Sequence, residues 1–204
     1  MPELSSEPLS PKEFMEGFIP AALAEATLDA ETDVKLGVKL DGEGGGEWVV
    51  HLSGGQFKVD ATERDVAAFT LVQTVDDWRG GLWEGRGGVF GEQAKTLLTQ
   101  GGAGGEDAPP PNVKVMEQLE ALGGLIQATV TGGEGGDWSI GFKLGPGAIP
   151  DEPTTHIKID AADAEALQSG SLDPMQAFMS GKIQVIGDMA LMMQMQAIAM
   201  QAGN

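Results

Sequence analysis

The sequence contains no cysteine, only two histidines and few basic residues. Disulfides and thiolate metal sites are therefore excluded, and a reducing cytoplasm is compatible with the chain. The 12 Lys and Arg residues stand against 31 Asp and Glu residues, which gives a formal net charge of −19. Because so acidic a surface repels phosphate backbones and anionic membranes, we set nucleic acid aside as a partner. The charge has two interpretations, a well-solvated acidic surface or a docking surface for a basic protein partner.

Long apolar runs are also missing. The longest apolar stretch, residues 189–200, is interrupted by glutamines and is too short to span a bilayer, so we expect no integral membrane segment. The first residues, Met1 to Leu4, have neither the basic region nor the apolar run of a secretory signal. We therefore expect a cytoplasmic protein.

Recognisable catalytic and metal sites are absent from the sequence as well. His51 and His156 stand in strand-like alternation with no second ligand or nucleophile readable nearby, so both are interpreted as structural or surface residues. No nucleophile elbow, zinc-protease motif, phosphate-binding loop or dinucleotide fingerprint occurs. We expect no catalytic residue, no metal ion and no cofactor, and hence a protein that is not an enzyme.

Glycine is abundant instead, with 31 residues clustered in short runs that are typical of turns between strands. The segment at residues 100–112, QGGAGGEDAPPPN, combines glycines with three consecutive prolines. Such a segment is a flexible piece followed by a stiff one, which is typical of an interdomain linker. We expect a first domain over residues 1–100, a linker over 101–112 and a second domain over 113–204.

The two expected domains resemble each other. Residues 40–52 and 130–142 each predict a strand, a turn of glycines and acids, an acidic residue, a tryptophan and an alternating strand. Trp48 and Trp138 hold the same place in this pattern. Chance similarity of two glycine-rich hairpins is the alternative, but in each half a further strand then leads into a capped helix. A duplicated domain is therefore predicted.

Periodicity, caps and turn signals predict an α+β fold. In the first domain a capping box, Ser10 to Glu13, opens a helix that Pro20 interrupts or bends. Strands are predicted near residues 34–40, 47–52, 56–59 and 69–73, and helices near 75–82 and 89–100. In the second domain helices are predicted near 113–122, 161–168, 174–180 and 189–202, and strands near 125–130, 137–144, 154–159 and 182–186.

The C-terminal segment is rich in methionine and almost uncharged. Seven of the ten methionines lie between Met175 and Met200. The predicted helix 189–202 is apolar on two faces, one with Met189, Met192, Met193 and Met200 and the other with Leu191, Met195 and Ile198. One face can pack on the sheet, whereas the other needs a lid, a partner chain or a ligand. Flexible methionine suits a pocket with variable contents, but the pattern alone favours ordinary core or a dimer interface.

The stretch from Asp173 to Leu191 resembles the signature of the sterol carrier protein 2 (SCP-2) family. Asp173-Pro174 opens an apolar helix, Gly181-Lys182 follows, and an alternating strand, a glycine and an apolar final helix complete the order. The resemblance covers residues 113–202 and implies a twisted β-sheet covered by helices on one face, with an apolar tunnel between them. The first domain resembles the family more weakly over residues 36–85, lacks the Gly-Lys strand and the final helix, and is interpreted as a degenerate copy.

The resemblance implies the non-enzymatic binding or transfer of an apolar lipid, such as a fatty acid, a fatty acyl-CoA, a phospholipid or a sterol-like molecule. The residues expected to line the pocket are Trp138, Ile140, Phe178, Met179, Ile183, Val185, Met189, Met192, Met193 and Ile198. One alternative is a structural or assembly module, in which the apolar C-terminal helix packs on a second copy of the chain or on another protein. A third is an accessory that presents a lipid substrate to an enzyme.

Overall fold

The computed structural model describes residues 4–24, 33–60, 66–88, 90–92, 95 and 113–202. The chain begins with a helix that has a π-helical turn in its middle, and continues with four strands and a short helix. These elements are α1 (Pro11–Glu13), η1 (Phe14–Phe18), α2 (Ile19–Leu23), β1 (Asp33–Asp41), β2 (Gly46–Ser53), β3 (Gln56–Asp60), β4 (Phe69–Thr74) and α3 (Val75–Trp83). The π-helical turn directly precedes Pro20, which has no N–H to donate to the carbonyl four residues before it.

The C-terminal half adds four more strands and four helices within the described residues. They are α5 (Val113–Leu122), β5 (Gly124–Thr131), β6 (Trp138–Leu144), β7 (Thr155–Asp160), α6 (Ala161–Gln168), α7 (Pro174–Met179), β8 (Ile183–Gly187) and α8 (Met189–Ala202). Every predicted strand is confirmed with ends within one residue. The predicted linker and most of the predicted helix 89–100 lie outside the described residues.

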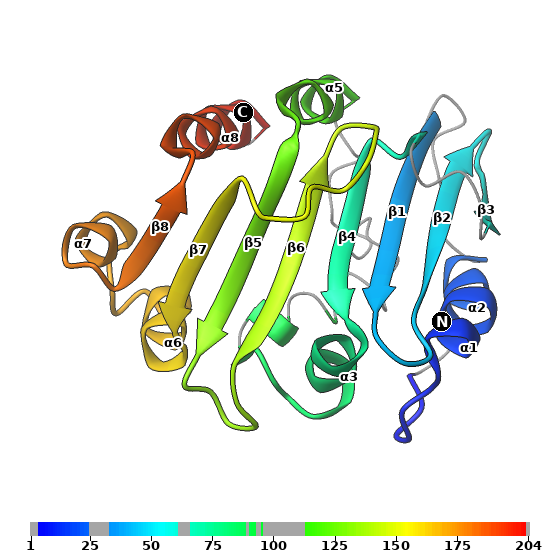
Figure 1. Ribbon diagram of the computed structural model, residues 1–204, viewed down its shortest axis with the longest axis horizontal. Coiled ribbons are helices and arrows are strands. Elements are labelled where there is room, and N and C mark those ends of the chain that lie inside the picture. Colours follow the sequence, from blue (N-terminus) through cyan, green and yellow to red (C-terminus); the bar gives the residue numbers. More distant parts are fainter. Residues whose placement is uncertain are drawn as a thin grey trace.

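The eight strands form one continuous sheet in the order β3-β2-β1-β4-β6-β5-β7-β8. The N-terminal half contributes the first four strands and the C-terminal half the last four (Figure 1). The halves meet where β4 and β6 pair antiparallel, from Phe69 opposite Leu144 to Val72 opposite Gly141. The predicted division at residues 101–112 stays a prediction, but the sheet itself runs through both halves.

Each half repeats the same strand arrangement. In both, a hairpin is followed by a strand that pairs parallel with the first hairpin strand, giving β2-β1-β4 and then β6-β5-β7. Trp48 lies opposite Val38, whereas Trp138 lies opposite Val130, two residue pairs nearer its turn. The two tryptophans are therefore not equivalent, contrary to their alignment in the sequence. The turn after β1 spans residues 42–45 and the turn after β5 spans residues 132–137, and these two extra residues produce the shift.

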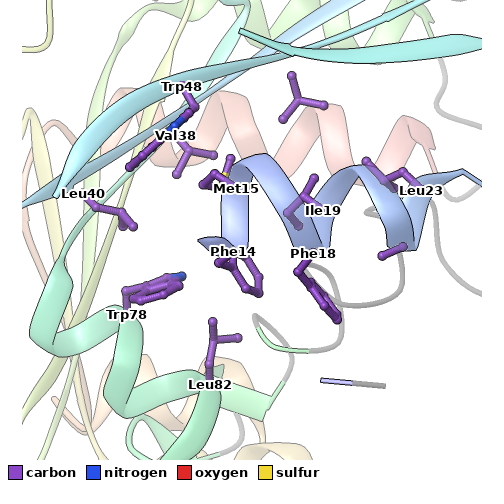
Figure 2. Packing of buried hydrophobic residues seen from close by; sticks show 12 residues of the cluster. Phe14, Met15, Phe18, Ile19, Leu23, Val38, Leu40, Trp48, Trp78 and Leu82 are labelled. Atoms are coloured by element: carbon purple, nitrogen blue, oxygen red, sulfur yellow. The ribbon is translucent and has the colours of Figure 1, made fainter. Parts of the chain in front are cut away.

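All the helices that pack on the sheet in the described residues lie on one face, called here the helix face. Because side chains alternate along strands, the pairing registers place Val38, Leu71, Phe142 and Ile157 on this face together. At the end of the helix face formed by the first half, Phe14 of η1 is fully buried against β1, β2 and α3, with its ring centroid 5.3 Å from that of Trp78. Figure 2 shows this packing. The fold is α+β, with a twisted sheet covered by helices on one face.

Four of the helices form two pairs at opposite ends of the strands. α3 and α6 continue directly from the ends of β4 and β7, capped by Thr74 and Asp160. α5 and α8 lie together at the other end (Figure 1). The middle of the helix face therefore lies between two rows of helices.

A buried arginine joins α3 of the first half to the hairpin of the second. Arg86 Nη1 lies 2.7 Å from Asp76 Oδ2, and Arg86 Nη2 donates to the carbonyl of Asp137 at 2.8 Å. Nearby, Trp138 Nε1 donates to the carbonyl of Asp77 at 2.8 Å. A Cβ at Gly87 would lie 2.5 Å from the Trp138 ring, so the close approach requires glycine there. The first half thus encloses a large core side chain of the second.

Replacing Arg86 with alanine is expected to lower the free energy of unfolding by about 2 kcal/mol, because a largely buried group loses charge-assisted hydrogen bonds, one of which joins the two halves. The matched control is Arg79→Ala on α3, whose ion pairs with Asp76 and Glu84 are exposed. Its cost should stay below about 1 kcal/mol. Urea unfolding of both variants measures the difference, and equal costs would contradict the assignment.

Candidate functional site

The segment after α6 is built from local signals. The Asp173 side chain accepts a hydrogen bond from the Gln176 N–H at 3.0 Å, and Pro174 occupies the first helical position of α7. The helix ends in a Schellman motif, with hydrogen bonds from Gly181 N to Phe178 O and from Lys182 N to the α7 carbonyl five residues back. Gly181 has a φ of 76°, as this ending requires. The Asp-Pro and Gly-Lys pairs thus set the two ends of α7.

The turn between β8 and α8 is equally specific. Gly187 has a φ of 107° and lies so close to the carbonyl of Thr154 that a Cβ there would clash with it. The next residue, Asp188, accepts hydrogen bonds from the backbone N–H groups of Ala190 and Leu191 at the start of α8. At the other end of β8, Lys182 pairs with Asp163 of α6. These contacts fix β8 and α8 against β7 and α6.

The two apolar faces of α8 have different surroundings. Leu191 and Ile198 are buried, and Leu191 packs with Ile126 and Leu144 of the sheet. By contrast, Met189 and Met193 are 41% and 68% exposed. The face that carries Leu191 and Ile198 therefore packs on the protein, and the other face exposes Met189 and Met193 to solvent while Met192 is partly buried.

The residues predicted to line a pocket fall into three groups. Trp138 and Ile140 are buried in a core cluster beneath α6, with Ile183 at its margin. Val185 on β8 and Met192 on α8 are partly buried, and Ile198 on α8 is buried. Phe178, Met179, Met189 and Met193 are exposed along α7 and α8. The structure thus brings only some of these ten residues together, and their contact with a ligand stays a prediction.

Between the two rows of helices, the helix face carries an apolar strip of side chains that are only partly buried. The strip consists of Val185 on β8, Ile157 on β7, Ala128 on β5 and Phe142 on β6. Ile157 lies opposite both Ala128 and Val185, and Phe142 lies diagonally beyond Ala128. Of these four residues, only Val185 was predicted from the sequence. Alternation along β7 places Ile157 on the same face as Ile159, and alternation along β6 places Phe142 on the same face as Trp138. The strip is a surface of apolar side chains that packing within the protein does not fully cover.

The opposite face of the sheet is more polar. The Thr129 hydroxyl lies 2.8 Å from Ser139 Oγ and 2.8 Å from His156 Nε2, so the three side chains form one hydrogen-bonded network. Burial lowers the pKa of His156 below its ordinary value of 6.5, and the positive charge of Lys158 lowers it further. A neutral imidazole in a satisfied network fits the structural role predicted for His156. His51 lies 2.7 Å from Asp33 at the surface.

Two clefts are hollowed elsewhere in the described part of the protein. One, of about 400 Å³, lies where the halves meet and is lined by residues that include Lys39, Gln127 and Ser139, together with Ile149 of the loop after β6. The other, of about 460 Å³, lies beside Trp48. Of the predicted pocket residues, only Ile140 lines either cleft. The described residues bring no three His, Asp or Glu side chains together as a metal site.

Comparison with known proteins identifies the C-terminal half. Residues 108–200 match the model of the SCP-2 sterol transfer family, which is a little under half of the chain. This part of the chain is an SCP-2 domain. Among the described residues, no helix of the protein combines the length and apolar character needed to cross a bilayer.

Relatives of the SCP-2 domain occur in larger proteins. Sterol carrier protein 2 of Gallus gallus is 29% identical over 168 residues, 78% of this chain and 27% of that protein. Hydroxysteroid dehydrogenase-like protein 2 of Xenopus tropicalis is 32% identical over 87 residues, 40% of this chain and 21% of that protein. The chain thus spans about a quarter or less of the length of these relatives. The solution structure of sterol carrier protein domain 2 of Helicoverpa armigera aligns with a TM-score of 0.32 and 25% identity, over 45% of this chain and 76% of that one.

The lowered pKa of His156 predicts a pH-dependent stability. Between that lowered pKa and 6.5 the unfolded chain binds more protons than the folded protein, so the free energy of unfolding contributed by His156 rises with pH through this window. It is fully present above 6.5 and is lost as the pH falls through the window. Urea unfolding of the wild type and His156→Gln between about pH 7.5 and about pH 5 should show a wild-type advantage that shrinks on acidification. Parallel pH profiles would contradict the prediction.

Proposed function

We propose that the SCP-2 domain binds an apolar lipid on its apolar strip and carries it without changing it chemically. The observation that supports this function most directly is the strip itself, a row of partly buried apolar side chains across four strands between two rows of helices. Burying apolar surface yields about 25 cal/mol per Å², so a strip left partly open favours an apolar ligand. Fatty acids, fatty acyl-CoA, phospholipids and sterols are the candidate ligands.

The surroundings of the strip favour binding over catalysis. Its four side chains carry no polar group, and the imidazole of His156 lies on the opposite face of the sheet from Ile157, the next residue in β7. Affinity would therefore come from apolar contact, at about 0.8 kcal/mol for each methylene buried. We expect a site of this kind to tolerate differences in chain length and head group.

A second function, assembly through the C-terminal edge, is supported by a different surface. The C-terminal apolar edge consists of exposed side chains on α7, β8 and α8: Met175, Phe178, Met179, Ile186, Met189 and Met193. β8 is also the last strand of the sheet, so its outer backbone groups face no further strand among the described residues. An exposed apolar patch at an open edge is typical of a surface that binds another protein.

Two neighbouring residues of β8 separate the two functions. Val185 belongs to the apolar strip, and Ile186 points to the opposite face and is 53% exposed within the C-terminal apolar edge. Val185→Glu should weaken uptake of a fluorescent fatty acid at least tenfold, because a carboxylate would be desolvated by the lipid. Ile186→Glu, which introduces the same charge on the same strand, should leave uptake within about twofold of the wild type.

The same pair is measured by sedimentation velocity. If the edge is an assembly surface, Ile186→Glu dissociates an oligomer that Val185→Glu retains. Lipid binding on the strip would be refuted if Val185→Glu left fatty-acid uptake unaffected. It would also be refuted if the wild type took up no fatty acid and no lipid co-purified with it in native mass spectrometry. A wild type that is monomeric at all concentrations would refute self-assembly through this edge.

A further inference from the structure

The outer edge of β6 is covered by the N-terminal half. In the first half, β3 pairs with β2, the strand that corresponds to β6. In the second half the segment between β6 and β7, residues 145–154, forms no strand. The place of a β3 equivalent is taken by β4, which pairs with β6 in the same antiparallel sense. The SCP-2 domain is therefore completed by a strand from outside its own repeat.

This strand continues the apolar strip. Leu71 lies directly opposite Phe142, and Phe69 lies opposite Leu144. The rings of Phe69 and Phe142 stack with their centroids 5.5 Å apart and their planes inclined by 30°. Like the strip residues, Phe69 and Leu71 are partly buried apolar side chains on the helix face. The partly covered surface thus runs without a polar interruption from β8 to β4.

Beyond Leu71 the surface is closed, whereas Leu36 of β1, opposite Phe69, is partly buried. The next strand, β1, carries Val38 and Leu40 on the same face, and these are only 8% and 2% exposed. Both are packed beneath the N-terminal helix, in the cluster that Figure 2 shows around Phe14 and Trp78. Leu71 contacts this cluster and also the cluster around Trp138. At the level of Leu71 the strip therefore ends against the buried side chains of the N-terminal half.

We propose that Phe69 and Leu71 of the N-terminal half form the far end of the lipid site and set the length of acyl chain that the protein accepts. The inference rests on the proposed function, because it presupposes that the strip binds lipid. Five strands are separated by four spacings of about 4.8 Å, so the strip from β8 to β4 is about 19 Å long. The C-terminal half alone supplies about 14 Å, and β4 adds room for several further methylenes. The ligand class that fits is a single long, unbranched acyl chain.

The test is a series of saturated fatty acids, from decanoic to octadecanoic acid, bound to the full chain and followed by isothermal titration calorimetry. In the wild type each pair of added methylenes should lower the Kd by about fifteenfold until the strip is filled. Leu71→Phe should end this gain at a shorter acid than in the wild type. Phe69→Ala should extend the gain by at least one further pair of methylenes.

The matched control is Val72→Phe. Val72 is the next residue of β4, faces the opposite side of the sheet and lines the cleft of about 400 Å³, where a phenyl ring has room. The Val72→Phe substitution should leave the Kd of every acid in the series unchanged. If the wild type binds the series but Leu71→Phe and Phe69→Ala both follow it unaltered, the assignment of β4 to the site is wrong while lipid binding stands. If the wild type binds none of the acids, the proposed function fails and the inference fails with it.

Discussion

The pairing of β4 with β6 is the contact on which the rest of the structure depends. Four residue pairs join two four-stranded sheets into one, and they also give β6 the neighbour that its own half does not supply. Two further contacts between the halves lie close to this seam. Arg86 ties α3 to the second hairpin, and Trp138 is held by the carbonyl of Asp77. The pairing of β4 with β6, the ion pair and hydrogen bonds of Arg86 and the packing of Trp138 thus stabilise the same junction. The helix face is continuous across it.

The local elements could be predicted from the sequence because their signals are local. The alternation in β7, the cap at Asp160 and the glycine at Gly181 each specify a strand, a helix start and a helix end without reference to distant residues. The pairing of β4 with β6 could not be predicted, because no pattern in residues 69–72 and 141–144 indicates that these segments pair. The two tryptophans were misaligned because glycine-rich turns of different length look alike in sequence, whereas hydrogen-bond register distinguishes them.

The candidate site was predictable to a similar degree. The helical wheel separated the two apolar faces of α8, but only tertiary packing decides that Leu191 and Ile198 are buried and that Met193 is exposed. Alternation could have found Ile157 and Phe142 as companions of Val185 on one face. The continuation of the apolar strip onto Leu71 depends on the pairing of β4 with β6 and could not be predicted from the sequence. Side-chain periodicity therefore predicts which face of a strand is apolar, and topology decides which strands share a surface.

The acidic composition complements this exposed apolar surface. Met179 and Phe178 would favour self-association, while a net charge of −19 makes copies of the protein repel one another at moderate ionic strength. The surface can therefore keep apolar groups accessible to a partner or ligand and still resist indiscriminate aggregation. Salt weakens this repulsion, so the balance between the two forces depends on ionic strength.

The seam also has a consequence for how the protein is made. Phe69 precedes its partner Leu144 by 75 positions, so β4 leaves the ribosome well before β6 has been synthesised. During that interval the N-terminal half presents β4 as an unpaired edge, with apolar side chains on one side of it. Until the second half has been synthesised, the nascent chain therefore exposes an unpaired strand edge, which is the feature through which β-proteins most readily pair with the wrong strand. Charge on the emerging segment and the speed of translation become part of what determines whether this fold is reached.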